Sequence, residues 1–214
     1  MAPPHISLTL LAIPIAAYFL GSIPFGVILA RLFGGADVRK AGSGNIGATN
    51  VVRVAGPLAG ILTLFLDIAK GAGAVLLAER LADHSAAWMM IAAFAALVGH
   101  CFSVWLKFRG GKGVATAAGA FLVLSPLACL AAVILFLLMV IFWRYVSLGS
   151  LSAAAAMPLL TYFLWAPRRA PPLAVTYGTV AVTLLVLFKH RGNLQRLLHG
   201  AEPKFSFSKS KGTE

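Results

Sequence analysis

Long apolar runs separated by short basic segments constrain this chain more than any other feature. The runs cover residues 6–31, 57–78, 86–106, 113–124, 127–143, 148–165 and 173–188. A helix that crosses a bilayer needs about 20 mainly apolar residues, and most of these runs come close to that length or exceed it. Of the 214 residues, 60% are hydrophobic and 11% are charged, whereas a soluble domain carries about 25% charged residues. The sequence therefore predicts an all-α membrane protein, a bundle of about seven transmembrane helices.

The basic residues predict the orientation of this bundle. With seven crossings and the N-terminus outside, 14 of the 18 Lys and Arg residues fall in cytoplasmic loops or in the C-terminal tail. Only Arg80, Arg168 and Arg169 fall outside, and Lys70 lies within a span. Six crossings would place the basic tail outside, against the preference of Lys and Arg for the cytoplasmic side. Nucleic-acid binding is the other interpretation of a net charge of +12, but here the basic residues are divided among apolar runs, so we expect no nucleic-acid partner.

The domain organisation follows from the same pattern. Residues 1–204 are expected to form a single transmembrane domain, with a first span in place of a cleaved signal, and residues 205–214 a disordered cytoplasmic tail. Ser125-Pro126 interrupts an apolar stretch, so 113–124 is either a half-helix or one part of a kinked helix over 113–143. The two cysteines, Cys101 and Cys129, lack metal-ligand spacing and are interpreted as small buried residues.

A glycine-rich polar segment follows the first basic loop. It reads Gly42, Ser43, Gly44, Asn45, Ile46, Gly47, Ala48, Thr49 and Asn50, with Arg53 shortly after. Glycines let backbone N–H groups turn toward a ligand, and the hydroxyl, amide and guanidinium groups are donors for phosphate. The glycine spacing also fits a dinucleotide fingerprint, but that motif requires a preceding strand, and a membrane helix precedes this one. The segment predicts a phosphate site, with a flexible polar turn as the alternative.

A second polar segment runs from residue 99 to residue 116. It holds His100 and Ser103, and then the glycine-rich run Gly110, Gly111, Lys112 and Gly113 immediately before an apolar run. Free N–H groups and the helix dipole favour an anion at a helix start. The run is not a Walker A loop, because Leu106 occupies the first glycine position and Gly113 replaces the Ser or Thr. His100, at the end of its span, is interpreted as either structural or functional.

A third polar segment, residues 189–204, holds His190, Asn193 and Arg196. Taken alone, it is interpreted as a basic tail attracted to anionic lipid. The predicted topology places it on the same face as the other two segments, which favours a shared site. Asp67 and Lys70 lie at i and i+3 within the second span. Ionisable residues inside a membrane are paired or functional, and both readings stay open for this possible buried pair.

These segments resemble the signatures of a known family. Three patterns carry the resemblance: Ser43-Gly44-Asn45-x-Gly47-Ala48-Thr49-Asn50-x-x-Arg53; Gly99-His100-x-Phe102-Ser103 with Gly110-Gly111-Lys112-Gly113-Val114-Ala115-Thr116; and His190-Arg191-x-Asn193-x-x-Arg196 with Gly200-x-Glu202. In order and spacing they resemble the bacterial acyl-phosphate:glycerol-3-phosphate acyltransferases of the PlsY type, from Arg31 to Lys204.

The resemblance implies a multi-pass enzyme of the bacterial inner membrane whose active site faces the cytoplasm. It would transfer a fatty acyl group from acyl phosphate to the 1-hydroxyl of sn-glycerol 3-phosphate, giving lysophosphatidate and phosphate as the first acylation step of phospholipid synthesis. A functional link to an acyl-phosphate-forming enzyme is expected. An acyl phosphate is already activated, so neither a cofactor nor a metal is expected, and positioning with charge stabilisation could supply most of the rate.

The roles of individual residues are expected as follows. Ser43, Lys112, His190 and Asn193 are the candidate catalytic residues. Two groups hold the substrates: Ser43, Gly44, Thr49, Asn50 and Lys112 hold the acyl-phosphate headgroup, and Arg53, His190, Asn193 and Arg196 hold glycerol 3-phosphate. The remaining candidates for substrate binding are Asn45, Gly47, His100, Ser103, Gly110, Gly111 and Gly113. The acyl chain is expected to lie between helices.

The general base and one rival function stay open at this stage. The His-x-x-x-x-Asp dyad of other acyltransferases is not found, since Trp105 and Gln195 occupy the Asp position after His100 and His190. His190, His100 and a phosphate oxygen of a substrate are the candidates for the base. A transporter of anions or phosphate esters would also use broken helices and buried charges. Against it, the polar motifs gather at one face and no internal repeat is visible.

Overall fold

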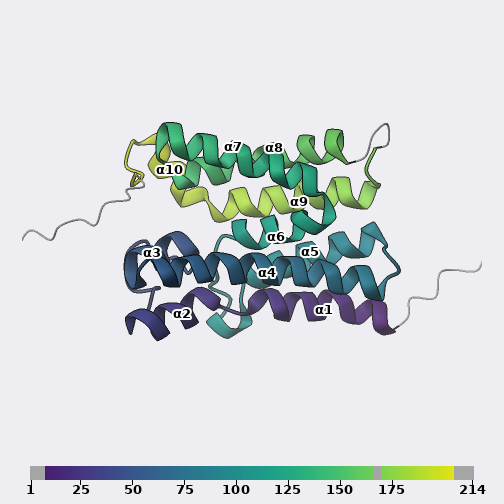
Figure 1. The fold of residues 1–214 in the computed structure, drawn as a ribbon, viewed down its shortest axis with the longest axis horizontal. Helices are drawn as coiled ribbons and strands as arrows, with labels where there is room; N and C mark the ends of the chain where they lie inside the picture. Colours follow the sequence, from purple (N-terminus) through teal and green to yellow (C-terminus); the bar gives the residue numbers. More distant parts are fainter. Residues whose placement is uncertain (1–7, 166–169, 205–214) are drawn as a thin grey trace, which may run out of the picture.

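The computed structural model describes residues 8–165 and 170–204, and every regular element in these ranges is helical. The elements are α1 (Leu8–Ser22), α2 (Phe25–Gly34), α3 (Ala48–Ala55), α4 (Pro57–Leu81), α5 (Ala86–Cys101), the short 3-10 helix η1 (Val104–Leu106), α6 (Val114–Leu124), α7 (Pro126–Trp143), α8 (Val146–Leu164), α9 (Leu173–Lys189) and α10 (Arg191–Leu198). Figure 1 shows α1 to α4 in one layer and α7 to α10 in another, with α6 between them. The predicted all-α membrane bundle is confirmed.

Within the described ranges, five helical segments are long and apolar enough to cross a membrane. They are Leu10–Gly34, Pro57–Leu81, Ala86–Leu106, Pro126–Trp143 and Val146–Leu164. A sixth is added if α9 and α10, bent by 59°, form one span. The start of α1 and the whole of α10 lie at opposite ends of the bundle (Figure 1), as an odd number of crossings requires. The count of seven and the orientation in the membrane stay predictions.

Two X-Pro steps set helix ends within the apolar runs. The break expected at Ser125-Pro126 is confirmed, since α6 ends at Leu124 and α7 begins at Pro126. The alternative of one kinked helix over 113–143 is wrong, because α6 packs on α4 whereas α7 packs mainly on α8. With 11 residues, α6 is about 16 Å long, roughly half the hydrocarbon thickness, and so corresponds to the half-helix alternative. The run 6–31 also breaks, at Pro24, which was not predicted.

The contact between α1 and α5 positions the end of α5, where His100 lies. Gly21 and Gly99 each face the backbone of the other helix so closely that a Cβ on either would overlap it. Small residues let two membrane helices approach closely, so that side chains of one helix can donate hydrogen bonds to the backbone of the other. The Ser103 hydroxyl donates to the Ser22 carbonyl at 2.6 Å, and the Tyr18 hydroxyl donates to the Phe102 carbonyl at 2.8 Å. These contacts fix the backbone from which the second polar segment continues.

Three further expectations concern the cysteines, the C-terminal tail and the number of domains. Cys101 and Cys129 are free and buried, as predicted. The tail at 205–214 lies outside the described residues. The assignment of residues 1–204 to one transmembrane domain stays a prediction.

Candidate active site

Asn50 organises the first glycine-rich segment. Its side chain is buried, and its Nδ2 donates to the carbonyls of Val38 at 3.0 Å, Ala41 at 3.1 Å and Asn45 at 2.8 Å. Its Oδ1 accepts the backbone N–H of Ser43 at 2.9 Å. A buried amide that is satisfied by backbone groups rigidifies what it contacts. Asn50 therefore holds the loop in shape and presents Ser43, in addition to bordering the cavity described below.

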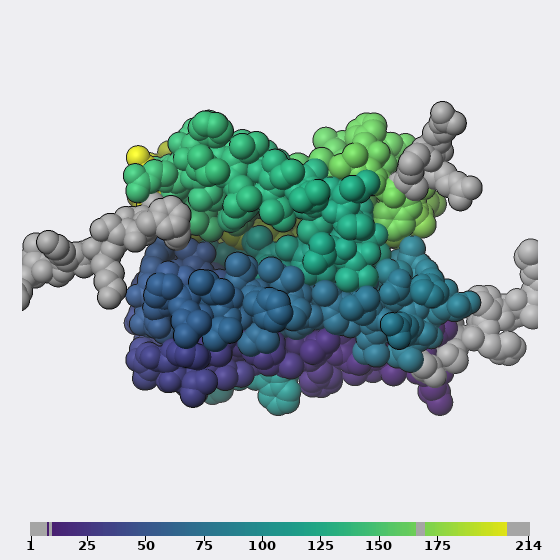
Figure 2. Space-filling model, viewed as in Figure 1, coloured from purple at the N-terminus to yellow at the C-terminus, as the bar shows by residue number. Residues whose placement is uncertain are grey.

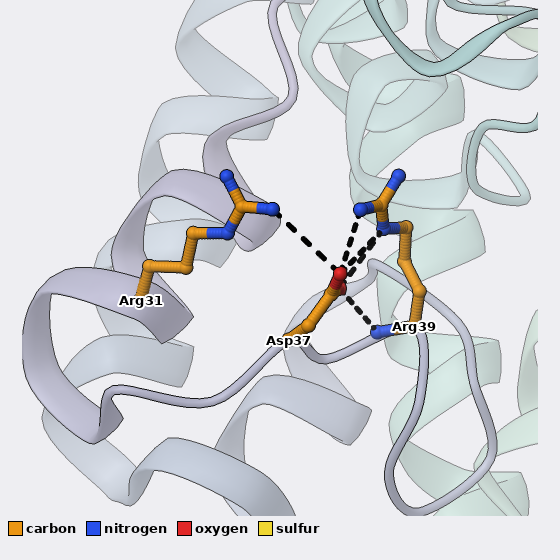
Figure 3. Close-up of polar contacts among 3 residues, drawn as sticks. All are labelled: Arg31, Asp37 and Arg39. Atoms are coloured by element: carbon orange, nitrogen blue, oxygen red, sulfur yellow. Dashed lines mark hydrogen bonds and ion pairs between the residues drawn. The ribbon is translucent and has the colours of Figure 1, made fainter.

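A second device orders the same loop from outside (Figure 3). The Asp37 carboxylate accepts hydrogen bonds from Arg39, with Nη2 to Oδ2 at 2.6 Å and Nε to Oδ1 at 2.9 Å, and its Oδ2 lies 3.7 Å from Nη2 of Arg31. The hydrogen bonds from Arg39 hold the pKa of Asp37 well below its usual range. Because Arg31 belongs to α2, the cluster ties the end of that helix to the loop that precedes α3.

The glycines of the second segment serve close packing. The N–H of Gly110 donates to the Cys101 carbonyl at 3.2 Å, and the N–H of Gly111 donates to the His100 carbonyl at 3.0 Å. A Cβ on Gly111 would overlap the His100 ring. These two backbone N–H groups are therefore engaged by the end of α5, and what they position is the next residue, Lys112. Gly113 then adopts φ +84°, a left-handed value that favours glycine, and caps α6.

Lys112 connects the second segment with the third. Its Nζ donates to Asn193 Oδ1 at 2.5 Å. Burial lowers the pKa of Lys112 to about 8; the nearby Glu202 carboxylate opposes this shift, and the positive charges of Arg196 and Arg53 reinforce it. A lysine with a lowered pKa among other cations marks a place where a negative ligand would restore the balance.

Glu202 completes a chain of polar contacts from Lys112. Asn193 Nδ2 donates to Glu202 Oε1 at 2.6 Å, and Arg196 Nε donates to Glu202 Oε2 at 2.7 Å. Glu202 belongs to the third sequence pattern, but its role was not predicted. Here its carboxylate orients Asn193, which in turn contacts Lys112 Nζ, so Glu202 positions the groups that face the cavity.

His190 lies at the bend between α9 and α10, and only one of its ring nitrogens has a partner on α9. Its Nδ1 lies 2.8 Å from the carbonyl of Val186, which can only accept a hydrogen bond, so Nδ1 carries the hydrogen. In the neutral ring Nε2 is then the acceptor. His190 is buried and borders the cavity.

Asp67 and Lys70 form a buried ion pair, with Lys70 Nζ 2.8 Å from Asp67 Oδ1. Lys70 Nζ also donates to the carbonyl of Ile23 at 2.9 Å, and His100 Nδ1 lies 3.7 Å from the same Asp67 oxygen. The paired interpretation is thus confirmed. Asp67 and His100 also border the cavity, so a role in the site stays a prediction.

One cavity of about 450 Å³ joins these elements. Its wall includes twelve of the predicted residues: Ser43, Asn45, Gly47, Thr49, Asn50, Arg53, Asp67, His100, Lys112, Gly113, His190 and Asn193. The wall as the described residues define it does not include Gly44, Lys70, Ser103, Gly110, Gly111 or Arg196. It does include Glu202, which had no predicted role, and Ser147 and Ser150, which were not predicted. Ser147 and Ser150 lie one helical turn apart in an apolar run, and this spacing could have indicated a polar face on that helix.

The polar end of the cavity lies where helices begin. Gly47, Ala48 and Thr49 at the start of α3, and Gly113 and Val114 at the start of α6, form part of its wall. Helix N-termini present free N–H groups and partial positive charge, which favour a phosphate. Arg53 and Lys112 add formal charge at the same place.

The other end is apolar and lies between α4, α6, α7, α8 and α9, with wall residues such as Ile68, Phe121, Val133, Met157 and Val182. Figure 2 shows the surface hollowed between the blue α4 and the green α7. A ligand with a phosphate at one end and a hydrocarbon chain at the other fits this division.

Comparison with known proteins agrees with the motifs. Residues 11–200 match the sequence profile of the family described as glycerol-3-phosphate acyltransferase. The chain belongs to this family. The acyltransferase from Syntrophotalea carbinolica is 55% identical over 191 residues, which cover 89% of this chain and 95% of the relative. The one from Geobacter sulfurreducens is 48% identical over 189 residues, covering 88% and 94%.

Two solved structures share the fold. Both are of PlsY (YgiH), described as an integral membrane glycerol 3-phosphate acyltransferase, and each covers 92% of this chain. The glycerol 3-phosphate form has a TM-score of 0.85 at 38% identity and is itself covered to 96%; the lysophosphatidic acid form has 0.83 at 37% and is covered to 95%. This chain is thus a PlsY-type integral membrane acyltransferase, and the transporter alternative gains no support.

Proposed function

We propose that the protein transfers a fatty acyl group from acyl phosphate to the 1-hydroxyl of sn-glycerol 3-phosphate, giving lysophosphatidate and inorganic phosphate. The observation that carries this proposal is a cavity that has both a cationic, helix-capped end and an apolar end. Similar proteins have been solved in a glycerol 3-phosphate form and a lysophosphatidic acid form, which supports one substrate and the product.

The cationic end would hold the two phosphates. Lys112 Nζ and the N-terminus of α6 would bind the acyl-phosphate headgroup, and Ser43 and Thr49 would donate hydrogen bonds to it. Arg53, from the last turn of α3, would bind the phosphate of glycerol 3-phosphate, together with Asn193. Donors fixed by the surrounding network stabilise charge without reorganising during the reaction.

The transfer itself is an attack on a mixed anhydride. The 1-hydroxyl oxygen attacks the acyl carbonyl carbon, the bond from that carbon to the phosphate oxygen breaks, and phosphate leaves. The hydroxyl proton passes to His190 Nε2 or to a phosphate oxygen of a substrate. A general base contributes about 10²–10⁴-fold, so a His190→Ala variant that retains more than about a tenth of kcat would assign the proton to the phosphate.

The decisive assay uses the purified protein in detergent with glycerol 3-phosphate and palmitoyl phosphate, and follows lysophosphatidate and phosphate by chromatography. Palmitoyl-CoA is the comparison donor. We expect product only with palmitoyl phosphate, because the cavity offers phosphate-binding groups and the chain has no His-x-x-x-x-Asp dyad. Equal or faster turnover with palmitoyl-CoA in a phosphate-free preparation would refute the proposed donor. The acyl phosphate must come from a separate enzyme that forms this anhydride.

The same proposal places the protein in the bacterial inner membrane with its polar motifs on the cytoplasmic side. In a Cys101→Ser, Cys129→Ser background, single cysteines at Arg109 and Ser85 test this orientation. We expect an impermeant thiol reagent added to intact cells to label position 85 and not position 109. Labelling of position 109 from outside would overturn the proposed topology.

A further inference from the structure

The apolar end of the cavity has an open side and a closed floor. At the side, Leu64 of α4 and Leu137 of α7 remain 45% and 48% exposed. At the far end, Phe121, Met157 and Val182 are 2%, 8% and 4% exposed and belong to one buried core cluster. A chain can therefore pass sideways from the bilayer into the cavity, whereas its methyl end meets packed side chains.

The depth of this floor follows from helix geometry. On α8, the wall residues include Ser147 near the polar end and Met157 at the other end, a distance of about 15 Å at 1.5 Å per residue. From Val182 on α9 to His190, the residue that follows this helix, the distance is about 12 Å by the same arithmetic. One leaflet of the hydrocarbon core is about 15 Å deep, so the cavity matches the length of an ordinary membrane acyl chain.

We infer that Met157, together with Phe121 and Val182 of the same core cluster, forms a floor that sets the acyl-chain length preferred by the enzyme. The inference rests on the proposed function, because it concerns the acyl chain of that donor and product. Met157 is the member of the floor best suited to this role. It is buried and stands at the deep end of the α8 face that borders the cavity.

The effect of acyl-chain length on kcat/KM then depends on the methylenes nearest the floor. A chain that reaches the floor buries each methylene from water, which is worth about fourfold in binding per methylene. A chain that exceeds the floor must fold back or displace core side chains, and overpacking a core is unfavourable. We therefore expect a maximum in kcat/KM along a series of saturated acyl phosphates, and not a continuous rise.

The experiment changes the size of the side chain at position 157, and with it the depth of the cavity. Met157→Ala removes three heavy atoms beyond Cβ and should shift the maximum toward longer chains, raising the stearoyl-to-myristoyl ratio of kcat/KM by about tenfold. Met157→Phe should lower the same ratio. Leu159→Ala is the matched control, because Leu159 lies on the same helix with 64% of its surface exposed and away from the cavity; it should leave the ratio unchanged. Ratios taken relative to wild type cancel differences in substrate solubility.

Two further measurements distinguish a change in selectivity from a loss of fold, and failure of the floor from failure of the proposed function. Met157→Leu conserves volume and should preserve both the ratio and the thermal stability, which separates a loss of fold from a change in selectivity. Binding of lysophosphatidates of the same chain lengths, measured by native mass spectrometry, tests the floor without any donor. Wild type that is inactive with every acyl phosphate would refute the proposed function alone. Unchanged ratios and unchanged lysophosphatidate selectivity in both Met157→Ala and Met157→Phe would overturn the floor.

Discussion

Replacing Lys112 tests the site most directly. Its Nζ is within 2.5 Å of Asn193 Oδ1 and borders the cavity beside the N-terminus of α6. Its ammonium and the N–H groups of α6 can thus converge on one anion. Removing a charge-assisted contact to a phosphate in such a site costs about 2–4 kcal/mol in the transition state, which corresponds to roughly two to three orders of magnitude in kcat.

The assay is lysophosphatidate formation by purified Lys112→Ala, Lys112→Arg and Arg109→Ala. The last is the matched control, a basic residue of the same loop whose side chain is exposed. Lys112→Ala should lose activity by the factor above while its thermal stability stays close to that of wild type. Lys112→Arg should also be impaired, since a planar guanidinium does not replace a compact ammonium between Gly111 and Gly113. Arg109→Ala should remain active.

The Lys112→Arg variant gives the result that would refute this role of Lys112. If Lys112→Arg retains wild-type activity, Lys112 is only a charge that sets membrane topology, for which Arg serves as well. The assignment of the site would then be wrong even though family membership stands.

Three other predictions use the same preparation. Because a lysine is charged below its pKa and the pKa of Lys112 is about 8, kcat/KM for the donor should fall as the pH rises through about 8, and this limb of the pH profile should be missing in Lys112→Ala. Gly111→Ala should lower both activity and thermal stability, since its Cβ would overlap the His100 ring, whereas Gly192→Ala, whose Cβ would lie 3.7 Å from the nearest side-chain atom, should be tolerated. Glu202→Gln should raise the KM for glycerol 3-phosphate and lower the melting temperature, because a neutral amide replaces the carboxylate that accepts from both Asn193 and Arg196, at a cost of about 1–3 kcal/mol. A melting temperature and a KM that both equal those of wild type would show that this carboxylate positions nothing.

The long helices could be predicted from the sequence because lipid imposes a simple requirement. Every backbone polar group within the bilayer must be satisfied inside its own helix, so a span is read as an unbroken apolar run. The predicted run 173–188 and the observed Leu173–Lys189 agree for this reason. The short helices α3 and α10 carry no such signal, because each has only eight residues and contains arginine, so neither forms an apolar run of the length that a span needs. Side-chain contacts shape their surroundings, such as those of Asn50 with the loop before α3 and that of Lys189 with the Cys101 carbonyl, and an apolar run does not reveal such contacts.

The candidate site shows the same division between what a residue type reveals and what its neighbours decide. Glycine next to a lysine predicts an anion site, and Lys112 does border the cavity. Yet the N–H groups of Gly110 and Gly111 donate to the carbonyls at the end of α5, so both glycines serve packing, and their predicted role in substrate binding stays a prediction. Sequence alone cannot separate these roles, because both require a residue without a Cβ. The difference lies in what occupies the space where the Cβ would be, and for Gly111 that is the His100 ring. The glycines of this segment therefore mark how closely it approaches the end of α5, and the proposed site for the ligand rests on Lys112, which they position.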